Sequence, residues 1–236
     1  MVNNELSYDN GWGQLWSDCM VYGPSRRHQQ RIIKKCLENV EFNSVLEVGC
    51  GNGMNLMNVV RSYSPSNYAG LDISNEALKR VESILPGGSF FKIDIEKKYL
   101  GTKYDMILCC DTLEHLKDDS ACLRNISRMS GRFVLVSTLT GKMRKSEKEV
   151  GHVRNYTKDN LISKLKAAGL EPIKVVNWGF PFFSPLHRSL LDIFPQKINY
   201  GEFGLFRKLI SNILYIVFFF NFRGWGDYIF VLSKKV

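Results

Sequence analysis

Short apolar runs alternate with segments of helical periodicity along most of the chain. The run "YDMILCCD", at 104–111, is almost continuously apolar, which is typical of a strand that helices cover on both faces. The segment "TKDNLISKLKAAGL", at 157–170, has apolar residues at helical spacing between a threonine cap and a glycine. Repeated alternation of such strands and helices predicts an α/β fold, with a mostly parallel sheet and helices on both of its faces.

The expected elements follow from the same patterns. We expect strands at 45–49, 67–74, 89–95, 104–111, 131–138, 171–179 and 227–235. We expect helices at 24–39, 54–62, 75–85, 113–129 and 157–170. A chain of 236 residues, of which 44% are apolar, can build one domain with a large core. We therefore treat residues 1–236 as a single domain.

The composition bears on the cellular setting and on the partners. The six cysteines form no C-x-x-C pair and have no zinc-ligand spacing with a histidine, so a cytoplasmic protein with reduced thiols is expected. The first residues, "MVNNELSYDNGW", lack the basic start and the apolar stretch of a signal peptide. A net charge of +9 suits a nucleic acid, a membrane surface, an anionic substrate or ordinary solubility, and it excludes none of them.

A glycine turn, "GCGNG" at 49–53, follows the first expected strand. Ligands of open parallel sheets bind beyond the carboxyl ends of the strands, and this turn lies at such an end. A dinucleotide fingerprint would need a glycine where the chain has Met54, and the Gly-Lys-Ser/Thr ending of a phosphate-binding loop is missing. The turn therefore indicates either close approach of the backbone to another kind of ligand or a tight connection between strand and helix.

Carboxylates stand at the ends of the next three expected strands, as Asp72, Asp94 and Asp111. A carboxylate after the second strand can accept hydrogen bonds from both hydroxyls of a ribose. Asp94, beside the apolar Ile95, could take the amino group of an adenine while the isoleucine packs on its face. Each aspartate alone could be an ordinary cap. Fitting residues at four consecutive strand ends favour a shared ligand site.

These motifs resemble those of the class I S-adenosylmethionine-dependent methyltransferases. "VLEVGCGNG" is similar to their first motif, "GLDIS" to the second, "FFKIDIE" to the third and "YDMILCCDTLEHL" to the fourth. "GHVRNYTKDNLISKLKAAGLEP" is similar to the segment before their sixth strand. The resemblance covers roughly residues 20–179 and the final strand. It implies S-adenosylmethionine as the cofactor and a Rossmann-like sheet of seven mostly parallel strands, the last one antiparallel.

The resemblance also implies contacts with the cofactor. Glu47 would reach the ammonium group of its methionine part, and Asp72 would hold the ribose. Ile73 would pack on the adenine, which Asp94 and Ile95 would flank. The other implied contacts lie in the glycine turn and after the fourth strand: Gly49, Cys50, Gly51, Gly53 and Asp111.

Two histidines, His115 and His152, are candidates for the base that would take a proton from a hydroxyl acceptor. The alternative is structural, at a helix start for His115 and in loop hydrogen bonds for His152. Asp111, Glu114 and His115 have D-x-x-E-H spacing, and His152 could join them in space. Some methyltransferases with a similar E-x-x-E-H pattern bind magnesium, and such a set of oxygen and nitrogen ligands is chemically reasonable. Cap and surface roles are nevertheless favoured over a divalent metal site.

The N-terminal residues, 1–40, are expected to form a helical lid. The stretch before the first strand is rich in aromatic side chains, and in the family it often folds over the cofactor. The alternative is that these aromatics only pack the first helix onto the sheet. The candidates for contacts with the acceptor, three in this segment and two beside His152, are Tyr22, Arg27, His28, Arg154 and Tyr156.

Residues 180–224, rich in Phe, Leu and Pro, interrupt the alternation. A hairpin connection usually needs only about 2–5 residues, so this segment is an insertion with its own role, and we expect it to be largely helical. Within 203–225, the charge-free part from Leu209 to Phe222 is shorter than the ~20 residues that span a bilayer, and cations bracket it. It is either a buried helix that covers the substrate pocket or an interfacial segment that makes peripheral contact with a membrane.

The expected activity is methyl transfer from S-adenosylmethionine to a small-molecule, lipid-linked or saccharide acceptor, with oxygen as the favoured nucleophile. Nucleic acid is not favoured, because the chain reads "DTLE" at 111–114 where base-methylating enzymes of this class carry a D/N-P-P-Y/F motif. One alternative is a regulatory subunit that binds the cofactor without transferring a methyl group. A nicotinamide oxidoreductase is the other, and the glycine missing at position 54 counts against it. The sequence leaves the oligomeric state open.

Overall fold

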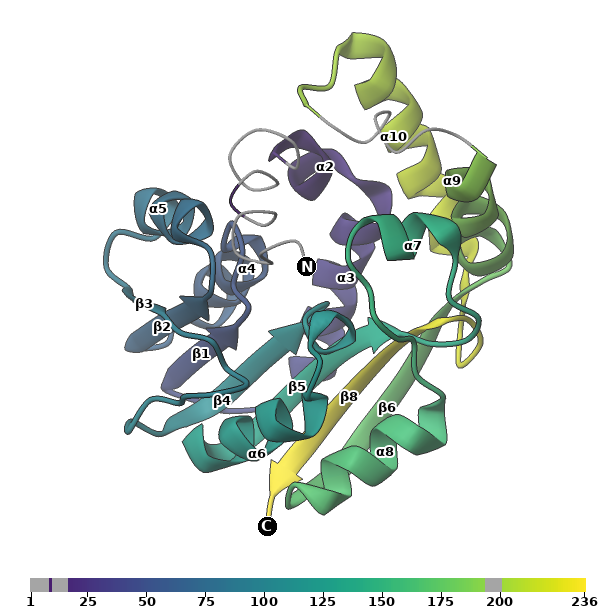
Figure 1. The fold of residues 1–236 in the computed structure, drawn as a ribbon. Helices are drawn as coiled ribbons and strands as arrows, with labels where there is room; N and C mark the ends of the chain where they lie inside the picture. The colour runs from purple at the N-terminus through teal and green to yellow at the C-terminus, as the bar shows by residue number, and fades with distance from the viewer. Residues whose placement is uncertain (1–8, 10–16, 194–200) are drawn as a thin grey trace.

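The computed structural model describes residues 9, 17–193 and 201–236 (Figure 1). These residues form an eight-stranded sheet in the order β3-β2-β1-β4-β5-β8-β6-β7. The first five strands in this order are parallel, and β8 lies antiparallel between β5 and β6. The strands are β1 (Ser44–Val48), β2 (Asn67–Asp72), β3 (Ser89–Lys92), β4 (Tyr104–Cys110), β5 (Ser130–Leu139), β6 (Leu170–Phe180), β7 (Phe222–Arg223) and β8 (Tyr228–Lys235). The expected α/β sheet is confirmed, and the two-residue β7 is an addition to the seven expected strands.

Helices cover both faces of this sheet, as the alternating pattern predicts (Figure 1). On one face, apolar side chains of α3, α4 and α5 pack in a cluster with Met106 and Leu108 of β4. On the other face, side chains of α6 and α8 pack with Ile107 and Cys109. Successive residues of a strand point to opposite faces, so a strand covered on both sides needs the unbroken apolar run that β4 has. The principal helices are α3 (Pro24–Leu37), α4 (Met54–Tyr63), α5 (Asn75–Ile84), α6 (Asp119–Met129) and α8 (Lys158–Ala167).

Two expected elements are shorter than their patterns suggest. The helix expected over 113–129 divides into the 3-10 turn η2 (Leu113–His115) and α6, because Asp118 caps α6 by accepting a hydrogen bond from the Ala121 amide at 2.8 Å. Strand β3 ends at Lys92, so Asp94 lies in the following turn, where its side chain accepts a hydrogen bond from the Glu96 amide at 3.1 Å. In both places a short polar side chain bonds to the backbone two or three residues ahead and ends the regular element.

The insertion before the last strand is largely helical, as expected. It contains the π-helical turn η3 (Phe182–His187), α9 (Arg188–Ile193), α10 (Leu205–Val217), the 3-10 turn η5 (Phe218–Phe220) and β7. Helix α10 lies against α3 and α2 (Ser17–Tyr22), while α9 lies beside the short α7 (Lys145–Glu149), which the sequence patterns did not predict. Among the described helices, none combines the length and the apolar character that crossing a membrane requires.

We predict that Gly53→Ala destabilises the fold. Gly53 has a φ of +73°, and a Cβ atom at this position would lie 2.3 Å from Cγ2 of Val81. A left-handed backbone alone costs a residue with a Cβ about 1–2 kcal/mol, and the overlap with α5 adds to this. We expect the free energy of unfolding, measured by urea denaturation, to fall by at least about 1–2 kcal/mol.

Gly101→Ala is the matched control for this prediction, because a Cβ atom on Gly101 would have nothing within 4 Å. It should unfold like the wild type. If the two variants were equally stable, the turn at Gly53 would tolerate a side chain and our interpretation of its backbone would be wrong.

Candidate functional site

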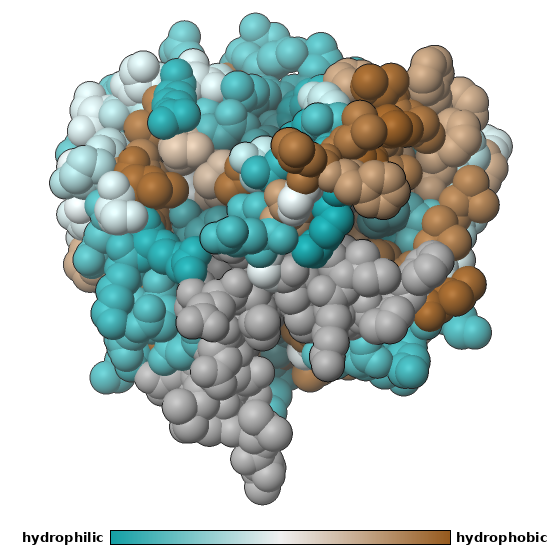
Figure 2. Space-filling view, turned by 90° about the horizontal axis from the view of Figure 1, so that it is seen from above, coloured by the Kyte–Doolittle hydropathy of each residue, from teal (hydrophilic) through white to brown (hydrophobic). Residues whose placement is uncertain are grey.

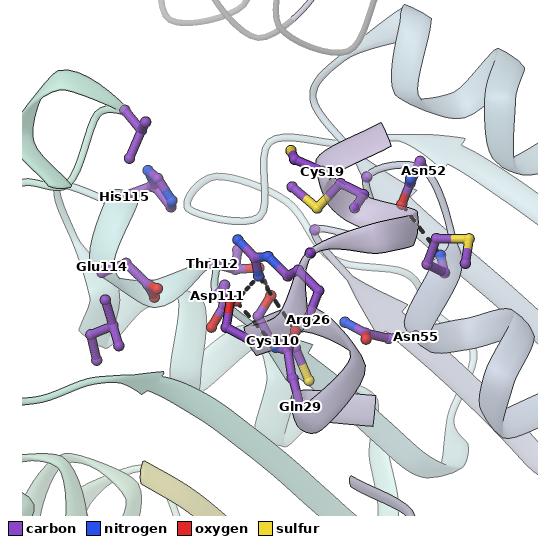
Figure 3. A pocket seen from close by; sticks show the side chains of 18 of the residues that line it. Cys19, Arg26, Gln29, Asn52, Asn55, Cys110, Asp111, Thr112, Glu114 and His115 are labelled. Carbon is purple, nitrogen blue, oxygen red and sulfur yellow. Dashed lines mark hydrogen bonds and ion pairs between the residues drawn. The ribbon is translucent and has the colours of Figure 1, made fainter. Parts of the chain in front are cut away.

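A cavity of about 690 Å³ opens beyond the carboxyl ends of β1, β2 and β4. Its wall has two chemically different parts. One part is acidic and formed by strand ends, with Glu47, Asp72, Asp94 and Asp111. The other part is apolar and formed largely by the insertion, with Phe183, Leu190, Leu191, Phe203, Ile210 and Leu214. Figure 3 shows Asp111 of the acidic part beside Arg26 and Gln29 of α3. A single ligand site of this size and mixed lining suits organic molecules.

Asp72 organises the glycine turn. Its Oδ2 accepts a hydrogen bond from the Gly51 amide at 2.9 Å, and its Oδ1 accepts one from the Ser74 amide at 2.9 Å. Gly49, Gly51 and Gly53 all have positive φ angles, so the turn needs residues that adopt this conformation without strain. Burial raises the pKa of Asp72, although the backbone donors favour the ionised form. The carboxylate therefore both shapes the turn and lines the cavity.

Glu47 is buried in the wall beside this turn. Its Oε2 accepts a hydrogen bond from the Leu56 amide at 3.0 Å, at the start of α4. Burial raises the pKa of Glu47 to about 8, with the Asp72 and Asp111 charges acting in the same direction. Ionised glutamate is thus disfavoured here until a cation comes close. The site is therefore suited to a ligand that places a positively charged group beside Glu47.

The predicted adenine contacts lie together at the same end of the cavity. Ile73, Asp94 and Ile95 all line it. Asp94 also forms an ion pair with Lys97 at 2.7 Å, but the lysine side chain is largely exposed. An exposed pair of this kind is weak, so the carboxylate remains available to a ligand.

Asp111 connects three distant parts of the chain. The Arg26 guanidinium of α3 donates to its Oδ2, and Gln29 donates to the same oxygen at 3.1 Å. The Tyr228 hydroxyl, at the start of β8, donates to the carboxylate at 2.8 Å. Burial alone would lower the pKa of Arg26, but the Asp111 charge outweighs it and holds the arginine pKa above its usual value. Asp111 thus lines the cavity, and it does so as half of a partly buried ion pair.

The sequence analysis missed Arg26, Gln29 and Tyr228. Tyr228 could have been found, because the first residue of an antiparallel last strand lies at the same sheet edge as the carboxyl ends of the parallel strands. Arg26 and Gln29 are three residues apart on α3 and share one face of the helix. The pattern of the helix does not distinguish this face from the one that carries Arg27 and His28.

The two predicted catalytic histidines lie side by side on the cavity wall. The ring centroids of His115 and His152 are 4.6 Å apart, in an edge-to-face arrangement. The loop that carries His152 is held against η2 by a hydrogen bond from the Val153 amide to the Glu114 carbonyl at 2.9 Å. Burial lowers the pKa of His115 to about 3. Burial also lowers the pKa of His152, where the Glu147 and Asp111 charges oppose it. Both imidazoles are therefore neutral near pH 7 and can accept a proton or a hydrogen bond.

Glu114 completes a cluster with this pair. One potential ligand atom from each of Glu114, His115 and His152 lies within 4.8 Å of the others. Oε2 of Glu114 accepts a hydrogen bond from Thr138 at 2.8 Å, and burial raises the pKa of Glu114 to about 8. The three side chains offer ligands suited to a divalent cation. Asp111, the fourth residue of the metal hypothesis, is instead engaged by Arg26, so a metal remains the weaker interpretation.

The expectation that Tyr22, Arg27 and His28 face the cavity is wrong. Arg27 donates to Oδ1 of Asn212 at 3.0 Å and to the Ser211 carbonyl at 2.9 Å, both in α10. His28 is stacked on Trp178, with ring centroids 5.1 Å apart. The aromatic ring of Tyr22 stacks on Phe203 and carries the Lys208 ammonium above it. These three side chains attach the N-terminal helices to the sheet and the insertion.

Arg154 and Tyr156 also lie outside the cavity. Arg154 donates to the carbonyls of Leu116 and Lys117 and forms an ion pair with Asp119. The Tyr156 hydroxyl donates to Asp119 at 2.7 Å and is buried. Both residues hold the connection between η2 and α6.

Of the expected lid, residues 1–40, the structure describes residues 9 and 17–40. The aromatic residues Tyr8, Trp12 and Trp16 lie outside the described residues. Of the described part, α2 and the start of α3 line the cavity through Cys19, Met20, Gly23, Pro24 and Ser25. Asp9 accepts hydrogen bonds from the Ser74 hydroxyl and the Glu76 amide, beside the end of β2.

Known proteins share both the sequence pattern and the fold. A family model described as a methyltransferase domain matches residues 24–175. The chain is 29% identical over 117 residues to a ubiquinone biosynthesis O-methyltransferase of Nitrosomonas europaea, which covers 45% of this chain and 48% of that protein. It is 29% identical over 124 residues to a malonyl-(acyl-carrier protein) O-methyltransferase of Ilyobacter polytropus, which covers 50% and 48% respectively. The chain thus spans about half the length of the curated relatives it matches.

A solved structure extends the likeness to almost the whole chain. It is magnesium protoporphyrin IX methyltransferase of Synechocystis PCC 6803 with bound S-adenosylhomocysteine. The two chains are 15% identical, with a TM-score of 0.57 that covers 89% of this chain and 84% of that one. At this identity the comparison shows a shared fold.

We predict that Glu114→Gln changes the pH dependence of stability. Because the folded protein raises the pKa of Glu114 to about 8, the folded state binds its proton more tightly than the unfolded chain, where the pKa is about 4.3. The stabilisation by this proton is complete below the unfolded pKa and is lost as the pH rises toward about 8. Glutamine keeps an acceptor for Thr138 without a charge. We therefore expect the melting temperature of Glu114→Gln to rise relative to that of the wild type as the pH increases from about 5 to about 8.

The melting curves should be recorded without cofactor. Glu82→Gln, which removes an exposed carboxylate from α5, is the control and should follow the wild-type curve at every pH. A difference between Glu114→Gln and the wild type that stays constant across this range would show that Glu114 is not protonated in the folded protein.

Proposed function

The chain belongs to the methyltransferase-domain family of S-adenosylmethionine-dependent enzymes, and we propose that it transfers the methyl group to a hydroxyl of an acceptor with an apolar part. The observation that carries this proposal is the two-part cavity, whose wall combines acidic strand ends, the apolar insertion and the His115–His152 pair. The acidic part suits a cationic nucleoside, and the apolar part suits an amphiphilic small molecule or a lipid-linked one. Two curated relatives carry O-methyltransferase names, which supports oxygen as the nucleophile.

The described residues fit the cofactor. Glu47 is a buried carboxyl group with a raised pKa, so a nearby cation would stabilise its ionised form. The ammonium group of the methionine part would supply this cation. Arg26, across the cavity, is the candidate partner for the methionine carboxylate. Asp72 would bind the ribose hydroxyls with the lone pairs that Gly51 and Ser74 leave free, and Ile73 and Ile95 would pack on the adenine. The bound cofactor supplies an activated methyl group on a sulfonium.

The protein must then orient the acceptor and keep water out. A neutral imidazole on the wall can accept the proton of the acceptor hydroxyl as the methyl group arrives. We assign this role to His152, because the Glu147 and Asp111 charges oppose the effect of burial on its pKa. The pKa of about 3 for His115 makes that residue a weaker base, suited to positioning the hydroxyl.

We predict that Glu47→Gln weakens the binding of S-adenosylmethionine. A hydrogen bond to a charged group contributes about 1.5–3 kcal/mol, so the dissociation constant should rise about 10- to 100-fold. Ionisation of Glu47 must precede the contact, so the wild-type affinity should increase from about pH 6 to pH 8 as this carboxylate loses its proton. Titration calorimetry in two buffers with different ionisation enthalpies measures the dissociation constant and the number of protons released on binding. The wild type should release a proton when it binds the cofactor, and Glu47→Gln should not.

The control for this experiment is Glu149→Gln, an exposed substitution on α7, which should bind like the wild type. Equal affinity of Glu47→Gln and the wild type across the pH range would remove Glu47 from the cofactor site.

We predict that the wild-type protein moves label from methyl-labelled S-adenosylmethionine into the lipid fraction of a cell extract. Mass spectrometry of the labelled product should place the methyl group on oxygen. His152→Ala should lower kcat about 10²- to 10⁴-fold through loss of the base, while the affinity for the cofactor stays unchanged. His115→Ala should raise KM for the acceptor more than it lowers kcat.

Label in the nucleic-acid or protein fraction would refute the proposed acceptor class. Cofactor binding without label in any fraction of extracts from several sources would instead favour the non-catalytic, regulatory interpretation. If His152→Ala kept the wild-type kcat, the proton of the acceptor hydroxyl would pass to another group or to water, and His152 would not be the base.

A further inference from the structure

Helix α10 carries an exposed apolar stripe in addition to the apolar residues that it packs against the protein. Its solvent-facing side carries Leu205, Leu209, Ile213 and Ile216, of which 89%, 56%, 52% and 61% are exposed. Surface helices of globular proteins normally turn such a stripe toward the core. Here four large apolar side chains, spaced by about one helical turn, point away from the protein.

The side of α10 that faces the protein carries polar groups beside apolar residues such as Leu214 and Val217. Buried Ser211 donates a hydrogen bond to the Tyr22 carbonyl. Arg27 of α3 binds the Ser211 carbonyl and the Asn212 side chain, and its guanidinium lies 4.0 Å from the centre of the Tyr215 ring. A ring nitrogen of His28 lies 2.8 Å from the Tyr215 carbonyl. These contacts determine the rotation of the helix, so it cannot turn its apolar stripe inward without leaving buried polar groups unpaired.

The apolar stripe continues beyond the helix. Phe219 and Phe220 of η5, Phe222 of β7 and Trp225 are 49% to 67% exposed. We call this set, from Leu205 to Trp225, the α10 surface. Figure 2 shows hydrophobic residues gathered on one side of the molecule, in the region of α9 and α10. Exposed apolar patches of this extent mark interaction sites.

Cations stand at both ends of the α10 surface. Arg207 and Lys208 lie in the first turn of α10, and the exposed Arg223 lies between Phe222 and Trp225. Arg31 of α3 lies beneath, with its guanidinium 4.6 Å from the centre of the Phe219 ring. An apolar stripe with cationic ends, rich in aromatic side chains, matches the interface of an anionic bilayer, where apolar groups enter the acyl region and cations meet the headgroups. A second copy fits poorly, because either face-to-face orientation would bring like charges together.

The α10 surface and the apolar part of the cavity are two sides of one structure. Ile210 and Leu214 of α10, together with Leu190 of α9, line the cavity. On α10, these cavity-lining residues alternate along the helix with Leu209 and Ile213 of the α10 surface. Helix α10 therefore separates the cavity from the α10 surface, and Leu190 of α9 continues the cavity wall.

We propose that the α10 surface rests in the interface of an anionic lipid bilayer, with α10 parallel to the membrane plane, and that the acceptor enters the cavity from the bilayer between α9 and α10. The docking is independent of catalysis. The entry of the acceptor rests on the proposed function. A membrane-resident amphiphile with a hydroxyl in its polar part is the class of acceptor that this arrangement fits.

We predict that the wild-type protein sediments with vesicles of phosphatidylcholine and phosphatidylglycerol, without cofactor or acceptor, and much less with phosphatidylcholine alone. The double variant Leu209→Ser/Ile213→Ser removes two apolar side chains from the α10 surface without changing the charge. It should lower the partition coefficient about tenfold or more. Arg223→Gln should lower it about fivefold on the anionic vesicles, the contribution expected of one cation at a charged surface.

The matched control is Ile84→Ser/Ile173→Ser, which removes two exposed apolar side chains from α5 and β6, outside the α10 surface. It should bind like the wild type, and circular dichroism should show all variants folded. Wild-type protein that stays in the supernatant with anionic vesicles would overturn the proposal. So would a dimer in ultracentrifugation that Leu209→Ser/Ile213→Ser dissociates while vesicle binding stays unchanged. Vesicle binding without methyl transfer would leave the docking intact and count against the proposed function alone.

Discussion

The pairing of the Asp111 carboxylate with Arg26 and Tyr228 holds the site together. A partly buried carboxylate is stabilised where charged or hydrogen-bonding partners replace the water that it loses, and these partners come from opposite ends of the chain. Arg26 ties the N-terminal helix α3 to the central strand β4, and Tyr228 ties the last strand to the same point. Because β8 runs antiparallel between β5 and β6, its first residue lies at the carboxyl ends of the parallel strands. The sheet order thus has a direct chemical consequence at the cavity.

Much of the fold and of the acidic part of the cavity could be predicted because both follow from local patterns. Strand ends are marked by the change from an apolar run to glycine or aspartate, and in a parallel sheet those ends must meet at one edge. Asp72, Asp94 and Asp111 line the cavity for this reason. Glu47, which lies within β1, was expected there only from the resemblance to the family. Asp94 lines the cavity from a turn, since its own hydrogen bond with the Glu96 amide follows the end of β3.

The helical residues around the cavity could not be predicted in the same way, because their positions depend on which face of a helix meets which neighbour. On α3, Arg26 and Arg27 are adjacent in sequence and point to different partners, Asp111 and α10. Both faces of the helix are polar, so periodicity alone does not rank them. Arg154 and Tyr156 illustrate the same limit, since Asp119, the partner that holds them away from the cavity, lies more than 30 residues earlier in the sequence.

Helix α3 also links the two proposed activities of the molecule. Arg26 and Gln29 on one face reach the acidic part of the cavity, while Arg27 and His28 on another bind polar groups of α10. The helix that pairs with Asp111 therefore also makes several of the contacts that hold the apolar stripe of α10 outward.

The charges around the cavity favour a cationic ligand. Arg26 offsets Asp111, and Arg188 offsets Glu147 through a buried ion pair. Glu47 and Glu114 have no cation bound to them among the described contacts, and burial raises the pKa of each to about 8. A neutral ligand would leave these carboxyl groups protonated. A ligand with a positive group beside Glu47 would favour the ionised carboxylate, because their attraction offsets the cost of burying the charge. The fold thus favours binding of a positively charged group in the acidic part of the cavity, at the strand ends, rather than in the apolar part that the insertion forms.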